Sequence, residues 1–412
     1  MKIFRVVWRT IVYNFSSSAL CIFLTALGTA ILCLVLLLSS QIDRQVHLNS
    51  KQIDLVIGAK GSPLQLILNS IFHVDYPTGN ILLDDARKIA QHPLVQLAVP
   101  LSMGDNYQGF RILGTDSSFL DLYALQLASG GWGTGDFEAV LGYEVARAKG
   151  LAIGDKIVGA HGLVAGNDLH DDHPYTVVGV LAESHSVADR LVLTNLSSVW
   201  HMHDHAHVHH GQGHEGDENR HEEEEVHDLL RMDVQGKEIT SMLIRYKNPT
   251  AVALFPRMVN QTTNMQAASP AIESARLFSI MGIGLDALAI LAWVLMLMAA
   301  ASVFVSLYNG FKNRKYELAV MRSMGAPRVI LLKLMLMEGI FITVIGALLG
   351  IVLAHAAAFA IAAEGVGDFI NAWHFGIEEV VIGLTGLLLG LIAALIPAVK
   401  AYSTSISQTL LR

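Results

Sequence analysis

The chain has 412 residues, of which 52% are hydrophobic and only 16% are charged, and its mean hydropathy is +0.46. Because soluble domains are close to one-quarter charged, this composition excludes an ordinary soluble protein and predicts a membrane protein with a sizeable soluble part. The formal net charge is −8, and we expect no nucleic-acid partner.

Four apolar runs are long enough to cross a bilayer as helices, which takes about 20 residues each. They cover residues 17–40, 288–308, 329–360 and 380–399. The third run contains Lys333, Glu338 and His355, whereas the other three carry no charged residue. The sequence therefore predicts an α-helical membrane protein with four transmembrane helices.

The basic residues beside these runs predict the orientation. Residues 1–16, 309–328 and 400–412 carry Lys and Arg, whereas residues 361–379 carry four acids and no Lys or Arg. Since basic loops stay in the cytosol, we expect a cytosolic N-terminus, a cytosolic loop and a cytosolic tail in a multi-pass membrane protein. A cleaved signal peptide is the alternative for the first run, but its length and the lack of a small-x-small motif favour an uncleaved anchor.

Residues 41–287 lie on the outer side in this scheme and are numerous enough for a folded domain. Short β-rich runs separated by Gly, Asp and Asn predict strands at residues 54–58, 97–100, 109–113, 139–141, 175–181, 191–193 and 241–245. Helices are predicted at residues 62–72, 142–150 and 250–262, and stalks that prolong the membrane helices at residues 41–50 and 269–281. We expect an α+β periplasmic domain inserted between helices 1 and 2.

One segment of this domain, residues 201–227, differs sharply from its surroundings. It holds nine of the 18 histidines, together with eight acids and one Arg, a formal charge of −7. A run of this composition does not make a packed core, so it is predicted to be a mobile loop between strands.

The chemistry of this loop is that of a metal-binding segment. Imidazole and carboxylate suit Zn²⁺ or another divalent metal, and the absence of Cys argues against Cu(I). Alternate residues of an extended strand are about 6.6 Å apart, so chelation requires a bent loop. The candidate ligands are His201, His203, His205, His207, His209, His210, His214, His221 and His227. The alternatives are an incidental low-complexity insert and a pH-sensing loop.

Two features within the membrane runs indicate packing and function. An ionisable group inside a bilayer is costly, so Glu338 is expected to face another helix or a polar crevice. The small-xxx-small pairs Gly346/Gly350 and Gly386/Gly390 predict close helix contacts in the third and fourth runs. There is no GxxxxGK[ST] motif, so we expect no ATP hydrolysis by this chain and do not classify it as an enzyme.

The run Arg314-Lys-Tyr-Glu317-Leu-Ala-Val-Met-Arg322-Ser-Met-Gly325-Ala, followed by Glu338 and Gly346-x-x-x-Gly350, resembles the signature of the MacB/FtsX-like family of ABC transporter permeases. The tail at residues 396–411 resembles the ending of that family. In the outer domain, residues 140–142, 150–155 and 175–181 resemble its periplasmic domain.

This resemblance implies that residues 313–324 form a coupling helix seated on a separate ABC ATP-binding subunit, which supplies the ATP. It also implies pairing with a second permease chain, identical or different, and transmission of motion to the periplasmic domain through the stalks. The implied docking residues are Arg314, Lys315, Glu317 and Arg322, with Gly325 and Pro327 as the hinge into the third helix. The alternative is that these charges are ordinary positive-inside anchors.

The sequence thus predicts the permease subunit of an ABC transporter whose periplasmic domain handles a divalent metal, zinc in particular, or a periplasmic metal-binding protein. Two alternatives stay open. One is a non-transporting mechanotransmission regulator of a cell-envelope enzyme. The other is a lipoprotein, peptide or drug export permease with an incidental His-rich loop.

Overall fold

The computed structural model describes residues 3–74, 76–160, 174–208, 236–314, 316, 320–321, 323–325, 327–363, 371–373 and 375–403. The chain divides into two compact units, a helical unit of Met1–Arg44 with Ile280–Arg412 and a sheet domain of Gln45–Ser279. The predicted order is confirmed, because the sheet domain is inserted between the first and second of four long apolar helices.

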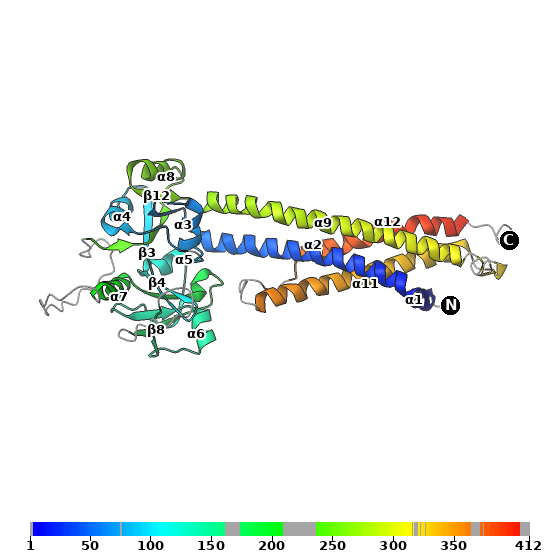
Figure 1. Cartoon of the computed structure of the whole chain (residues 1–412), viewed down its shortest axis with the longest axis horizontal. Helices are drawn as coiled ribbons and strands as arrows, with labels where there is room; N and C mark the ends of the chain where they lie inside the picture. The colour runs from blue at the N-terminus through cyan, green and yellow to red at the C-terminus, as the bar shows by residue number, and fades with distance from the viewer. Residues whose placement is uncertain are drawn as a thin grey trace, which may run out of the picture. The chain divides into compact units, whose positions relative to one another are not determined.

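The predicted membrane runs lie in four helices, which are α2 (Phe15–Ser50), α9 (Pro270–Asn313), α11 (Arg328–Ala363) and α12 (Ile377–Ser403) (Figure 1). Helix α2 continues through the predicted first stalk, and α9 begins with the predicted second stalk, so both stalk predictions are confirmed. An additional helix, α1 (Ile3–Tyr13), precedes α2 and was not predicted. It is amphipathic, with Val7 and Ile11 buried against α9 and α11.

Small residues allow the helices of the first unit to approach closely. A Cβ built on Gly346 would lie 2.7 Å from Cβ of Thr25 in α2, and one on Gly350 would lie 2.6 Å from the carbonyl oxygen of Ala26. A Cβ on Gly390 of α12 would come within 2.1 Å of Thr343 in α11. The predicted close contacts of Gly346, Gly350 and Gly390 are therefore confirmed, since any side chain there would push two helices apart.

The sheet domain is built on one mixed sheet with the strand order β12-β1-β11-β3-β4-β9-β6-β8-β5, with β7 paired to β8. Its strands are β1 (Leu55–Ala59), β3 (Val95–Tyr107), β4 (Phe110–Thr115), β5 (Leu127–Gly130), β6 (Glu138–Leu141), β7 (Lys156–Ile157), β8 (Tyr175–Leu181), β9 (Leu191–Asn195), β11 (Ser241–Tyr246) and β12 (Met265–Ala268). A separate pair joins β2 (Ile81–Leu82) to β10 (Glu238–Ile239). The β4/β9 and β6/β8 pairs are parallel and the other pairs are antiparallel, as expected of an α+β domain.

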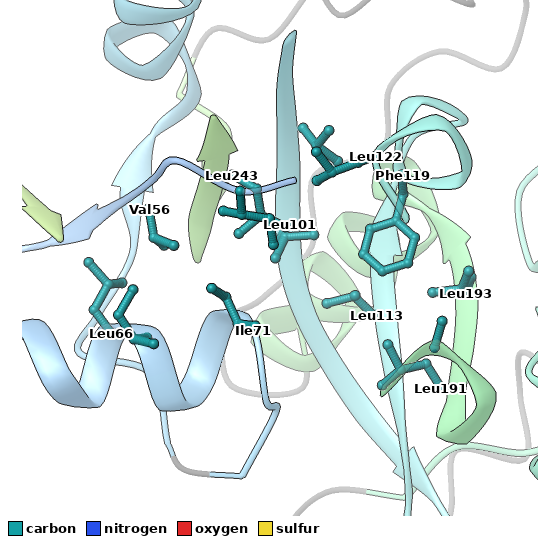
Figure 2. Packing of buried hydrophobic residues seen from close by; sticks show 14 of the residues in the cluster. Val56, Leu66, Ile71, Leu101, Leu113, Phe119, Leu122, Leu191, Leu193 and Leu243 are labelled. Atoms are coloured by element: carbon teal, nitrogen blue, oxygen red, sulfur yellow. The ribbon is translucent and has the colours of Figure 1, made fainter. Parts of the chain in front are cut away.

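Helices cover both faces of this sheet. Side chains of strand β1 point alternately to the two faces of the sheet, so Val56 packs in one core and Leu55 and Ile57 pack in the other. The first core, seen in Figure 2, packs the strands against α3 (Pro63–Ser70) and α5 (Ser118–Tyr123). The second packs them against α4 (Leu83–Ala90) and α8 (Ala251–Thr262). A third core lies between β6, β8 and α6 (Tyr143–Lys149).

One prediction about this domain is wrong in part. Residues 201–208, predicted to begin a mobile loop, are the end of helix α7 (Leu196–Val208). The helix forms because Leu196, Val199 and Met202 recur at helical spacing and are all buried. Val199 packs over Gly114 of β4. A Cβ added to Gly114 would lie 2.7 Å from Cγ2 of Val199. Residues 209–227 of the predicted loop lie outside the described residues.

Candidate functional site

Arg314, the first predicted docking residue, follows the end of α9 and contacts the N-terminal helix. Its Nη1 donates a hydrogen bond of 2.8 Å to the Thr10 hydroxyl, and its guanidinium lies 6.0 Å from the centre of the Tyr13 ring. Thr10 is buried, whereas Tyr13 is exposed. Arg314 thus joins the loop after α9 to α1, a role that the sequence did not reveal.

The helical path ends shortly afterwards at Gly325. The Met324 N–H still donates to the Val320 carbonyl at 3.0 Å, as in a helix, but Gly325 has φ +97°, a left-handed conformation that favours glycine. Pro327 then precedes α11. The break between two helices at the predicted hinge is therefore present. Lys315, Glu317 and Arg322, the other predicted docking residues, lie outside the described residues.

Glu338 lies in the interior of the helical unit, as predicted for a carboxyl group within a membrane run. It is 6% exposed and sits on α11 in the turn between Met335 and Ile342, both of which belong to the apolar core that α1 also enters. Burying a carboxyl group among apolar side chains costs free energy, so its presence here points to a functional role.

At the other end of the helical unit, polar contacts connect α2, α11 and α12. Gln41 and Asn371 are joined by two hydrogen bonds. Gln41 Nε2 donates to the Asn371 carbonyl oxygen at 3.0 Å, and the Asn371 N–H donates to Gln41 Oε1 at 2.7 Å. His355 Nδ1 lies 2.6 Å from the Ala372 carbonyl oxygen, and its Nε2 lies 3.2 Å from Glu379 Oε1. His355 is thus a polar link between α11 and α12.

The last turns of α2 make direct hydrogen bonds to a loop of the sheet domain. Asn49, which is 1% exposed, accepts a hydrogen bond of 3.0 Å from the Val187 N–H through Oδ1. Gln45 Nε2 donates to the His185 carbonyl at 3.3 Å. The last turns of α2 are therefore attached to residues 185–187 by two hydrogen bonds.

A buried carboxylate organises this loop through several hydrogen bonds. Asp189 is 5% exposed and accepts hydrogen bonds from the Ser184 N–H at 3.0 Å, the Ser184 hydroxyl at 2.7 Å and the His185 N–H at 2.7 Å. Several hydrogen bonds to one ionised group are stronger than neutral ones.

The loop is in turn packed on the centre of the sheet domain. A Cβ on Gly142, at the start of α6, would lie 2.3 Å and 2.4 Å from the carbonyl oxygens of Ala188 and Asp189. The chain then enters β9, which pairs with both β4 and β6 and leads directly into α7. Stalk α2, the loop at residues 184–190, β9 and α7 thus form one continuous line of contacts.

Helix α7 carries the first of the candidate metal ligands. His201 Nδ1 lies 3.1 Å from Asp136 Oδ2, and both side chains are about half exposed, at 49% and 43%. The backbone of residues 203, 205 and 207 is helical, and the remaining five candidates, at residues 209, 210, 214, 221 and 227, lie outside the described residues. In the part of the chain that the structure describes, no group of three His, Cys, Asp or Glu side chains is arranged to hold a metal ion.

Sequence reasoning missed Asn49, Asp189 and Asp136. Nothing in the sequence around Asn49 and Asp136 marks them, because each is defined by a partner distant in sequence. Only the Ser184-x-Ser186 pattern before Asp189 carries a local signal, since such residues favour side-chain-capped turns.

Comparison with known proteins agrees with the two-unit organisation. A family model described as MacB-like periplasmic core domain matches residues 18–262, more than half of the chain. A second, described as FtsX-like permease C-terminal, matches residues 289–406. No curated protein matches the chain.

Among solved structures, the chain is similar to the periplasmic region of MacB from Actinobacillus actinomycetemcomitans, with 12% identity over 56% of this chain and 95% of that one, at a TM-score of 0.34. It is also similar to the extracellular domain of the noncanonic ABC-type transporter YknZ from Gram-positive bacteria. That match has 12% identity over 53% of this chain and 99% of the other, at a TM-score of 0.30.

Proposed function

Because the chain belongs to the MacB/FtsX-like family of ABC transporter permeases, we propose that it transmits ATP-driven motion of a separate ATP-binding subunit to its periplasmic domain. In this proposal the N-terminus, the loop between α9 and α11 and the C-terminal tail face the cytosol of a bacterium, and the protein lies in the inner membrane. A second permease chain completes the assembly.

The observation that carries this proposal is the continuity of α2. The helix includes the first apolar run and reaches Ser50 without a break, and its last turns are bonded to the loop at residues 184–190 through Asn49 and Gln45. A helix moves as a rigid element over such lengths, so a shift at one end is delivered to the other.

The ATP-binding subunit would push on the segment between Arg314 and Pro327. Arg314 supports this role because it bonds to Thr10 of α1, so a displacement there would reach that helix. The helix break at Gly325 separates this segment from α11 and supports its predicted role as a hinge.

We further propose that the cargo or signal handled by the periplasmic domain is a divalent metal ion, zinc in particular, alone or carried by a periplasmic metal-binding protein. The composition of residues 201–227, with nine histidines and eight acids, supports this assignment.

Affinity purification of the tagged chain from its native membrane tests the permease assignment. We expect an ATP-binding subunit to co-purify, and Arg314→Glu to reduce its recovery. If no nucleotide-binding protein is recovered with the wild-type chain, the assignment fails.

Growth under zinc limitation and zinc excess tests the metal assignment in a strain that lacks residues 209–227. This deletion is preferable to removal of residues 201–227, because Met202 is 4% exposed and packs in the third core. Altered growth under either condition supports a zinc role. Unchanged growth favours an export permease or a mechanotransmission regulator with incidental histidines.

A further inference from the structure

Helix α1 bends away from the line of α2 instead of prolonging it. Gly346 of α11 lies against Thr25 of α2, as the close approach of the two helices shows. Phe341 comes five residues before Gly346, about 7.5 Å along α11, and its ring centre lies 4.9 Å from that of Phe4 in α1. In a straight continuation of α2, Phe4 would lie about 31 Å along the axis from Thr25. The contact between the two rings therefore requires that α1 turn toward α11.

The other end of α1 is fixed beside the end of α9. Thr10 accepts the hydrogen bond from Arg314, and the Tyr13 ring lies near the same guanidinium. Helix α1 ends at Tyr13, and the apolar run of α2 begins at residue 17. Helix α1 thus reaches from α11 to the end of α9 at the boundary of the first predicted membrane run.

The face of α1 that points away from the helical unit carries two chemically different stripes. The apolar stripe is Phe4, Trp8 and Val12, which lie one helical turn apart and are each at least half exposed. The arginine pair is Arg5 and Arg9, which are exposed as well and lie about 100° farther around the helix than their neighbours Phe4 and Trp8. The opposite face is the buried one that packs in the helical unit.

This arrangement fits the surface of a bilayer. Helices that lie in the plane of the interface place apolar side chains at the acyl boundary and basic side chains among the headgroups. Tryptophan is enriched at this depth, because its ring is apolar and its N–H can donate to polar groups. The chain has no acidic residue before Asp43, so the charge of this end is uniformly positive and complements anionic headgroups.

We propose that the exposed face of α1 binds the anionic phospholipids of the leaflet against which it lies. The apolar stripe enters the acyl boundary, and the arginine pair holds headgroup phosphates. Arginine suits this role because its planar guanidinium pairs with a phosphate through two parallel hydrogen bonds. The inference goes beyond the proposed function and depends on it only for the identity of this leaflet as the cytosolic one.

The first test measures the lipid affinity of the full chain in a neutral detergent by native mass spectrometry. The probes are dioctanoyl phosphatidylglycerol, which is anionic, and dioctanoyl phosphatidylcholine, which is zwitterionic. We expect the wild-type chain to bind the anionic probe more tightly, and Arg5→Gln with Arg9→Gln to weaken that binding by about 5-fold for each arginine. Arg147→Gln with Lys156→Gln is the matched control, because it removes the same charge from exposed positions of the sheet domain and should leave both affinities unchanged.

The second test locates the apolar stripe. The full chain is reconstituted in nanodiscs whose phospholipids carry bromine on their acyl chains, which quenches nearby tryptophans. Trp8→Phe keeps an aromatic ring but removes one fluorophore, so the fluorescence intensity that bromine quenches should fall. Trp132→Phe is the matched control, because Trp132 packs against the first core of the sheet domain and should not contribute to the quenched intensity.

The proposal is overturned if the wild-type chain binds both probes equally, or if the arginine variant and its control have equal affinity for the anionic probe. Equal quenched intensity in Trp8→Phe and Trp132→Phe would also overturn it. The melting temperature of the arginine variant in detergent should stay near that of its control, because both arginines are exposed.

The alternative occupant of this face is the ATP-binding subunit. If the arginine variant lost that subunit in co-purification while its lipid preference stayed unchanged, a protein would cover the face and the proposal would fail. Neither lipid measurement contains the subunit, so lipid binding by α1 would stand even where the permease assignment failed.

Discussion

Asn49, in the last turn of α2, accepts a 3.0 Å hydrogen bond from the Val187 N–H and is 1% exposed, so the end of this long helix is bonded to the loop at residues 184–190 of the sheet domain. Within the described residues its Nδ2 has no hydrogen-bond partner. A buried amide nitrogen without a partner costs free energy, so the Val187 N–H bond is the contact that holds this side chain in place.

Replacement of Asn49 by Leu should therefore uncouple the stalk from the loop. The change removes the acceptor at similar volume and leaves the Val187 N–H unpaired, at a cost of about 1–3 kcal/mol. Hydrogen–deuterium exchange should show faster exchange at residues 184–190. Asn80→Ala is the matched control, because Asn80 makes an exposed hydrogen bond to Glu238 elsewhere in the domain; equal exchange in both variants would speak against the junction.

Gly142→Ala should disturb the same loop from the other side. The added Cβ would lie within 2.4 Å of the carbonyl oxygens of Ala188 and Asp189, and a backbone contact of this kind cannot be relieved by a rotamer change. We expect a loss of about 1–3 kcal/mol in thermal or urea unfolding. Gly131→Ala, with open space around its Cβ, should be tolerated. Comparable losses in both variants would show that the close approach is not the cause.

Gly350→Ala should loosen the helical unit. An alanine normally favours a helix over glycine by about 1 kcal/mol, but here its Cβ would lie 2.6 Å from the Ala26 carbonyl oxygen. The expected result is a lower melting temperature in detergent. Gly383→Ala in α12, where the Cβ meets no atom within 4 Å, should be neutral or stabilising. A Gly350→Ala chain as stable as wild type would refute the packing of α11 on α2.

The stability of the periplasmic domain should fall in acid because of His73. Burial, with a smaller contribution from the Arg111 charge, lowers the pKa of this imidazole to about 3, against about 6.5 in an unfolded chain. Below about pH 6.5 the unfolded state binds a proton that the folded state does not. Stability is therefore lost as pH falls, by up to about 1.4 kcal/mol per pH unit.

His73→Asn removes this titration and suits the local backbone, where His73 has φ 54°. Melting temperatures between pH 7.5 and 4.5 should fall less steeply for the variant than for wild type, whatever their difference at pH 7.5. Parallel curves would show that His73 does not carry the acid sensitivity.

Much of the fold followed from local pattern. Strand β8 matches its predicted bounds because its alternating residues are buried on one side, and α6 ends at Gly150, which has φ 65°, as a glycine C-cap predicts. Helix α7 was hidden because histidines and acids dominate the composition after residue 200. Its apolar stripe depends on Gly114, which comes from a distant strand.

Some features of the candidate site could likewise be predicted from the sequence, whereas others could not. The charges of residues 314–322, the break at Gly325 and the buried Glu338 are visible in the sequence because they interrupt apolar or helical runs. The Asp136–His201 and Asn49–Val187 contacts are not, because each joins segments that only the tertiary fold brings together.

The most direct test of the account is hydrogen–deuterium exchange of the chain in nanodiscs with its ATP-binding subunit, with and without a non-hydrolysable ATP analogue. We expect the analogue to change exchange at residues 45–50 and 184–190 in the wild-type chain, and Asn49→Leu to abolish the change at residues 184–190. Identical exchange with and without nucleotide in the wild-type complex would contradict the claim that ATP-driven motion reaches the periplasmic domain through α2.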